Sequence, residues 1–153
     1  MTSDGITTKD WNRVGVMAAD IANARCADDD QAAEQRTKKI LLLLEKLERK
    51  YGRLPSILAT RADYTADVVG QARLLREAWT AAKRLGDHKN ITLITSSLAE
   101  LFVEERHDTR QGSVWVKRLA EALDVYWDSG EHGVYRRLER QIDRASGAAW
   151  PRS

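Results

Sequence analysis

Apolar residues recur along most of the chain with the three- and four-residue spacing that places them on one face of an α-helix. Six long apolar stripes are present, at residues 11–22, 33–51, 68–85, 91–102, 115–126 and 134–145, and a short one follows Pro55. No segment alternates apolar and polar residues over five or more positions between turn signals, so we expect no β-strand. The pattern therefore predicts an all-α protein of about six helices.

Residues typical of helix starts lie between the stripes. Thr7 is followed three residues later by an acid, which resembles a capping box for the backbone N–H groups of a first helical turn. Pro55 suits the first turn of another helix, because its missing N–H has no helical partner there. We expect Thr65 to begin the most regular helix, and either Asp87 or Asn90 to begin the next one.

Only a few residues separate one predicted helix from the next. Short connections force successive helices to lie side by side and antiparallel. No Gly-, Pro- or Ser-rich linker divides the chain. We therefore expect a single domain over residues 1–153, with 1–6 and 147–153 as tails, in which antiparallel helical hairpins stack as a repeat-like bundle.

Two segments have the residue order of a known helical repeat. Residues 78–87 end a helix with a Gly-Asp pair, and residues 97–102 carry a Leu-Ala pair followed by an aromatic residue. Weaker echoes of these elements lie at residues 62–64 and 119–120. On these features residues 54–142 resemble the tetratricopeptide-like helical repeat superfamily, and the resemblance implies a surface for protein partners.

The repeat period departs from that family. The turn at Gly86 is followed by the next comparable turn, at Ser129, 43 positions later. Tetratricopeptide repeats recur at about 34 residues. The predicted helices are therefore longer than the family pattern implies.

The composition is that of an ordinary intracellular domain. The 153 residues include 25 Lys and Arg against 23 Asp and Glu, and the single cysteine, Cys26, cannot form an intramolecular disulfide. The longest apolar run, residues 40–44, is far shorter than the ~20 residues of a membrane-spanning helix, and no secretory signal begins the chain. We therefore expect a soluble, cytoplasmic protein with no membrane partner.

The sequence holds no signature of a catalytic or cofactor site. The glycines are not spaced as in phosphate-binding loops, and no serine lies in a Gly-x-Ser-x-Gly turn. We interpret Cys26 as a buried structural residue at the end of the first helix. Glu104 and His107 form one Glu-x-x-His pair, whereas a di-iron bundle needs two such pairs and two further glutamates. We therefore predict no catalytic residue, no metal and no cofactor, and keep as a third hypothesis an enzyme whose helical active site is assembled in space without a sequence motif.

Basic residues become more frequent in the later part of the chain. From Lys38 onward there are 21 Lys and Arg against 16 Asp and Glu, with acids interleaved at the i, i+4 spacing of self-paired helical faces. Four arginines of the last helix fall on shared faces, as phosphate contacts require: Arg136, Arg137, Arg140 and Arg144. They support the alternative hypothesis of an oligomeric nucleic-acid-associated protein.

The five tryptophans indicate where a protein partner would bind. Trp79 and Trp115 lie on regular apolar stripes, so we expect them in the core. Trp127 lies one residue off its stripe, and Trp150 follows the last helix, where it either closes the end of the stack or stays exposed. Exposed tryptophans are frequent interface anchors. The leading hypothesis is a non-enzymatic protein-interaction or adaptor domain that binds another protein, or a second copy of itself, through Trp127 and Trp150.

Overall fold

The computed structural model describes the chain from residue 1 to residue 149, with side chains up to residue 147. Within that range every regular element is helical, which confirms the all-α prediction. There are seven α-helices in this range, close to the predicted six: one for each of the six long apolar stripes and the short helix expected after Pro55. They are α1 (Thr8–Cys26), α2 (Asp30–Tyr51), α3 (Pro55–Asp63), α4 (Val68–Leu85), α5 (His88–Glu100), α6 (Thr109–Val125) and α7 (Ser129–Ala149), and a π-helical turn, η1 (Leu101–Glu105), continues α5.

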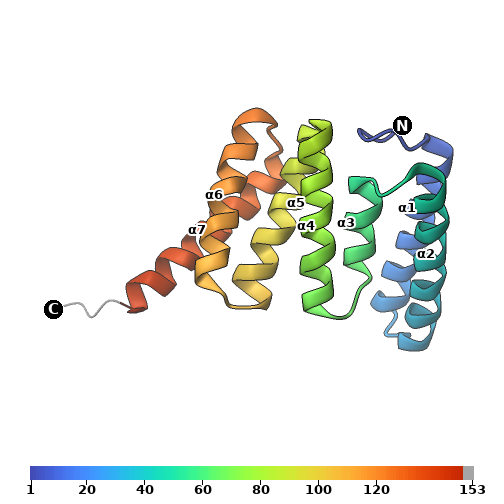
Figure 1. Cartoon of the computed structure of the whole chain (residues 1–153). Coiled ribbons are helices and arrows are strands. Elements are labelled where there is room, and N and C mark those ends of the chain that lie inside the picture. Colours follow the sequence, from blue (N-terminus) through green and yellow to red (C-terminus); the bar gives the residue numbers. More distant parts are fainter. Residues whose placement is uncertain (150–153) are drawn as a thin grey trace.

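The helices stack as antiparallel hairpins in two layers (Figure 1). α1 pairs with α2, α3 with α4 and α5 with α6, while α7 packs on α5 and α6. We call α1, α3, α5 and α7 the inner layer, in which α5 contacts both α3 and α7. The outer layer consists of α2, α4 and α6, whose backbones do not approach one another closely. Side chains join α4 to α6, where the rings of Trp79 and Trp115 meet edge to face with centroids 5.4 Å apart.

Side chains at the helix starts explain several boundaries. The Thr7 hydroxyl accepts a hydrogen bond from a first-turn N–H of α1, and Asp87 begins α5 in the same way, as predicted. The expectation that Thr65 begins α4 is wrong. Asp67 accepts from two backbone N–H groups of the first turn of α4, and the Thr65 hydroxyl donates to the carbonyl of Arg61.

Two clusters of buried apolar side chains hold the stack together. One joins α1 and α2 and includes Ile57 of α3, and the other runs from α3 to α7 and includes Phe102 and Trp115. Trp115 is thus a core residue, as expected. Trp79 packs against the same cluster but is only half-buried, and its indole N–H donates to the hydroxyl of the buried Thr95 over 3.2 Å.

The segment before α1 packs on the rest of the protein. Ile6 is fully buried, and Asp4 accepts hydrogen bonds from both the backbone N–H and the hydroxyl of Ser56 on α3. At the other end, α7 continues to Ala149, three residues into the segment that we expected to be a tail. The first six residues therefore connect the α1–α2 hairpin to α3.

Cys26 is exposed, so its interpretation as a buried residue is wrong. It is the last residue of α1, and the buried positions of this part of the helix are Ile21 and Ala24. A side chain two residues after Ala24 points about 200° away from it around the helix, toward solvent.

Candidate anion-binding site

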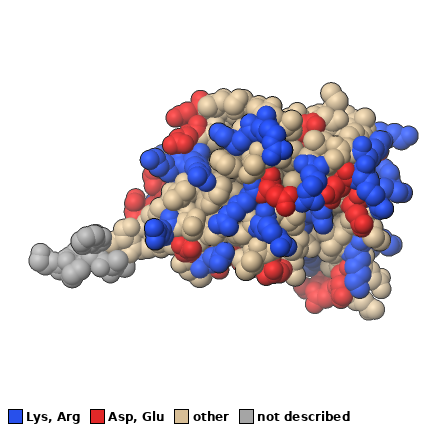
Figure 2. Space-filling model, viewed as in Figure 1, with Lys and Arg blue, Asp and Glu red and all other residues tan. Residues whose placement is uncertain are grey.

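Positive charge is concentrated in the outer layer. The helices α2, α4 and α6 carry 13 Lys and Arg against 7 Asp and Glu, whereas the inner layer and η1 together carry 9 against 9. In Figure 2, Lys and Arg side chains gather over the middle of the molecule, in the region of α4. The small net charge of the whole chain therefore conceals a strong difference between the two layers.

A groove runs along the exposed side of α4, and we call it the arginine groove. Its volume is about 710 Å³. Five arginines and one acid line it, together with small and apolar residues: Arg53, Arg73, Arg76, Arg84, Arg106 and Glu77, with Leu58, Val69, Ala72, Thr80 and Ala81. Such a ratio of bases to acids favours an anionic ligand.

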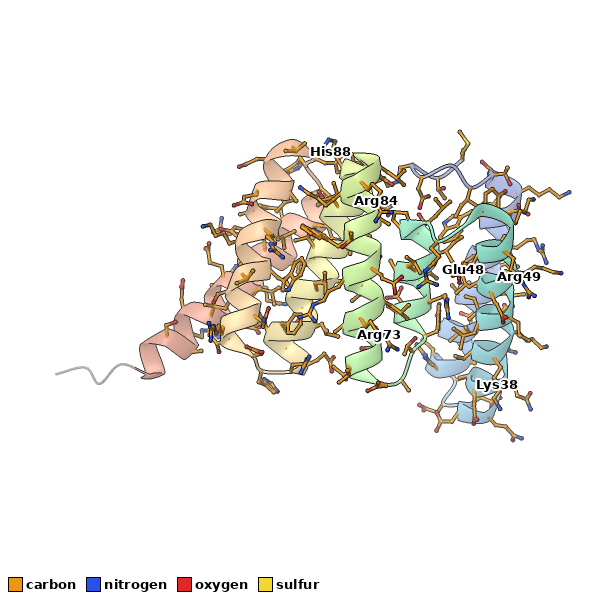
Figure 3. The ribbon with its side chains drawn as sticks, viewed as in Figure 1. Lys38, Glu48, Arg49, Arg73, Arg84 and His88 are labelled. Atoms are coloured by element: carbon orange, nitrogen blue, oxygen red, sulfur yellow. The ribbon has the colours of Figure 1, made fainter. Side chains whose placement is uncertain are left out.

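Three of these arginines come from one face of α4. Arg73, Arg76 and Arg84 are separated by three and eight residues, a spacing that keeps them within less than a third of a turn of one another. Figure 3 shows Arg73 and Arg84 toward opposite ends of the helix. Eleven residues separate these two, which corresponds to about 17 Å along the helix axis.

The acids beside the groove are already paired. Arg53 forms ion pairs with both Glu48 and Glu77, and its Nε donates to Glu77 over 3.0 Å. Arg61 donates to the second oxygen of Glu48 over 2.6 Å. Glu48 lies on the α2 side of α4 in Figure 3. These pairs connect α2, α3 and α4, and they engage both Glu48 and Glu77.

Two of those arginines are held over an aromatic ring. The guanidinium carbons of Arg76 and Arg106 lie 5.2 and 5.4 Å from the centroid of the Phe102 ring, which is buried. Within residues 1–149, Arg73, Arg76, Arg84 and Arg106 form no ion pair. Stacking on a ring orients a guanidinium while leaving its N–H groups free to donate. The arrangement gathers four guanidinium groups that lack a carboxylate partner, and an anion would relieve their mutual repulsion.

The arginines predicted as a nucleic-acid surface lie elsewhere, on α7. Arg137 donates to Glu100 and Glu104 over 2.8 Å each, which attaches α7 to the end of α5 and to η1. Arg136, Arg140 and Arg144 are exposed. The Arg137 side chain is 45% exposed and forms ion pairs with both glutamates, and the part of the four arginines in nucleic-acid binding stays a prediction.

Trp127 is 62% exposed, which confirms the exposure expected for it. Its ring lies 4.5 Å from the ring of His132, centroid to centroid, at the turn between α6 and α7. Tyr126 and Val125 beside it are exposed as well. Trp150 lies outside the described residues. The part of both tryptophans in partner binding stays a prediction.

Residues 1–149 contain no group of three or more His, Cys, Asp or Glu side chains arranged to hold a metal ion. Glu104 of the Glu-x-x-His pair accepts from Arg137 and from the Gln141 amide, which links it to α7. In the same range no helix is both long and apolar enough to cross a membrane.

Comparison with known proteins identifies no matching family, no similar curated sequence and no similar solved structure.

The arginine groove was not predicted from the sequence. A readable signal is present within α4, where Arg73, Arg76 and Arg84 share the face opposite the apolar stripe with a single acid. Arg53 and Arg106 come from a loop and from the segment after η1, so their approach to α4 depends on tertiary packing. In a count of charges along the chain, the acids at the helix starts offset these arginines, so the cluster does not stand out.

Proposed function

We propose that the protein is a non-enzymatic interaction domain that binds an acidic segment of a partner protein in the arginine groove. The observation that carries the proposal is the set of four guanidinium groups without a carboxylate partner around one groove. Arginine is suited to this task because its planar N–H groups can hold a carboxylate through two parallel hydrogen bonds. The resemblance to a helical repeat is compatible with this function, since stacked hairpins offer extended surfaces to other proteins.

Apolar surface within the groove favours a protein segment as the ligand. Val69 is 64% exposed beside the arginines and Ala81 is partly exposed, while Leu58 and Ala72 lie buried beneath the groove. A segment that mixes acidic and apolar side chains satisfies both features. The separation of about 17 Å between the ends of the arginine row matches five residues of extended chain or three turns of helix.

The proposal is tested by the binding of synthetic peptides to the full chain. We expect an 11-residue peptide that alternates Glu with Leu and Ala to bind, and its Gln counterpart to bind at least tenfold more weakly. A higher ionic strength should weaken the binding of the acidic peptide, because exposed charge pairs are screened by salt. Equal affinity of the two peptides, or no detectable affinity for the acidic one at low salt, would refute the proposal.

Nucleic acid is the second candidate ligand, and the surplus of bases in the outer layer favours it. None of the side chains that line the arginine groove is aromatic, so the groove offers no ring on which a base could stack. A single-stranded oligonucleotide is therefore the competitor in the peptide experiment. If it binds more tightly than the acidic peptide, with a steep dependence on salt, the nucleic-acid function replaces the protein-binding one.

A further inference from the structure

A second groove lies on the inner layer, and we call it the inner groove. Its volume is about 430 Å³, and its walls come from the segment before α1, from α1, from α3 and from α5. Trp11 and Asn12 line it from α1, Thr60 and Asp63 from α3, and Ser97 from α5. Side chains far apart in the sequence thus converge on one hollow.

Hydrogen bonds hold one end of the inner groove in place. The Asn90 amide donates to Asp87, Ser56 and Ser3 over 2.7, 3.2 and 3.3 Å. Asp4 accepts from Ser56, so the segment before α1, α3 and α5 are joined by one polar network. A groove whose walls are fixed before a ligand arrives loses less conformational freedom on binding.

Asp63 lies at the other end, and its position is unfavourable for a carboxylate. As the last residue of α3 it faces the negative end of the helix dipole. Its carboxylate accepts no hydrogen bond and forms no ion pair within residues 1–149, and it also lines an adjoining hollow with Glu100 and Glu105. The side chain is accessible to solvent, but the groove walls displace part of its water and raise its pKa to about 6.

The hydroxyl groups near Asp63 can only accept hydrogen bonds from a ligand. Thr60 donates its hydroxyl proton to the Ser56 carbonyl over 2.7 Å, and Ser97 donates to the Leu93 carbonyl over 3.2 Å. Each oxygen keeps a lone pair for a donor in the groove. Three side chains of this end therefore present acceptors, and the ligand that matches them is rich in N–H donors.

We propose that the inner groove binds a cationic group, a guanidinium or an ammonium, with Asp63 as its counter-ion and the Thr60 and Ser97 hydroxyls as further acceptors. The indole of Trp11 lines the same groove and adds an aromatic wall of the kind that attracts cations. Two cations line the groove: Lys89, which precedes Ser97 by eight residues and so lies about 12 Å along α5, and the terminal ammonium of Met1, which donates to the Thr8 hydroxyl over 2.6 Å. The cation is therefore directed to the Asp63 end.

The test is calorimetric titration of the full chain at pH 7.5 with two probes, a blocked Ala-Arg-Ala peptide and spermidine. Asp63→Asn should lower by at least tenfold the affinity for the probe that binds. Asp143→Asn, at an exposed position on α7, should leave that affinity unchanged. Binding of the peptide alone assigns the site to a basic side chain of a protein, and binding of spermidine alone assigns it to a free polyamine. If neither probe binds, or if Asp63→Asn binds as well as the wild type, the proposal is wrong.

Thermal unfolding of the same variants separates binding from structure. Asp63→Asn should unfold at the same temperature as the wild type or higher, because the substitution removes a charge that is unfavourable in the folded protein. Loss of binding together with a lower unfolding temperature would indicate a structural role for Asp63 and would count against the site. The inner groove is separate from the arginine groove, so either proposal can fail alone.

Discussion

The arginine groove and the inner groove lie on different layers of one helical stack. The groups without an ion-pair partner are positively charged in the arginine groove and negatively charged in the inner groove. In the arginine groove, four guanidinium groups have no carboxylate partner within the described residues. In the inner groove the Asp63 carboxylate has no base beside it. The same architecture therefore presents two sites of opposite charge.

The difference between the grooves follows from how the two layers pack. The backbones of α2 and α4 do not approach each other closely, and the arginines on the exposed side of α4 keep their charged ends in water. The inner helices α3 and α5 contact each other, and the groove over them partly excludes water from Asp63. Arginine stays charged at any physiological pH, whereas a partly desolvated carboxylate can be neutralised. Only the inner groove should respond to pH near neutrality.

The largest effect on stability is expected from substitutions of Phe102, whose ring lies beneath the arginine groove. Phe102→Ala should lower the free energy of unfolding by about 3–5 kcal/mol, because the ring is buried in the larger core cluster. Phe102→Leu keeps most of the apolar volume but removes the stacking of Arg76 and Arg106. Phe102→Leu should lower the free energy of unfolding by about 1 kcal/mol and weaken the binding of the acidic peptide several-fold. Denaturant unfolding and peptide titration measure both quantities, and full peptide affinity in Phe102→Leu would show that the ring does not orient the arginines.

A change of pH should distinguish the two grooves. The pKa of Asp63 is about 6, so at pH 5 only about a tenth of the carboxylate is ionised. Binding of the cationic probe should therefore fall about tenfold between pH 7.5 and pH 5. Arginines do not titrate in this range, so binding of the acidic peptide should stay nearly constant. Parallel titrations at the two pH values measure this, and an equal loss at both grooves would contradict the comparison.

Asp63→Asn should also change the dependence of stability on pH. The folded-state pKa of about 6 lies above the ordinary value of 3.8, so ionisation above pH 6 penalises the folded wild type and the penalty disappears as the pH falls toward 4. At pH 8 the variant should be more stable by about 1 kcal/mol or less, since solvent screens an accessible carboxylate. At pH 4 the two proteins should be equally stable in chemical denaturation. A variant that is less stable at pH 8 would mean that the charge has a partner.

The smallest effect on folding is expected at Trp127. Its exposed side chain contributes little to the core, so Trp127→Ala should change the free energy of unfolding by about 0.5 kcal/mol or less. If Trp127 is an interface anchor, as the sequence suggests, the same variant should weaken partner association by about 2 kcal/mol or more. Trp115→Ala is the buried control, with an expected loss of about 3–5 kcal/mol of stability. Comparable losses of stability in the two variants would show that Trp127 supports the fold.

Most of the fold could be predicted from apolar spacing and from residues such as Thr7 and Pro55, because local chemistry decides where a helix runs and begins. The start of α4 could not be assigned in this way, since Thr65 and Asp67 are both suitable caps and the carboxylate of Asp67 accepts two bonds. The exposure of Cys26 depends on the direction of the last turn of α1, which apolar spacing leaves open.

The two grooves could be predicted only in part. The row of arginines on α4 is visible in the sequence, but the ion pairs of Arg53 that occupy the nearby acids require three helices to meet. An acid at the end of a helix, such as Asp63, is a signal in itself because it opposes the helix dipole. Its neighbours Thr60 and Ser97 come from two helices, and their converging acceptors exist only after packing.

The most direct test of the account is a charge reversal in the arginine groove, Arg73→Glu with Arg84→Glu, compared with Arg140→Glu with Arg144→Glu on α7. Both pairs are exposed and change the net charge equally. Titration with the acidic 11-residue peptide should give an affinity about a hundredfold lower for the first pair, since two charge-assisted contacts become repulsive, and an affinity close to that of the wild type for the second. The first pair should also bind a peptide with Lys in place of Glu. Equal losses in both pairs, or full affinity after reversal at residues 73 and 84, would contradict the proposal that this groove receives the partner.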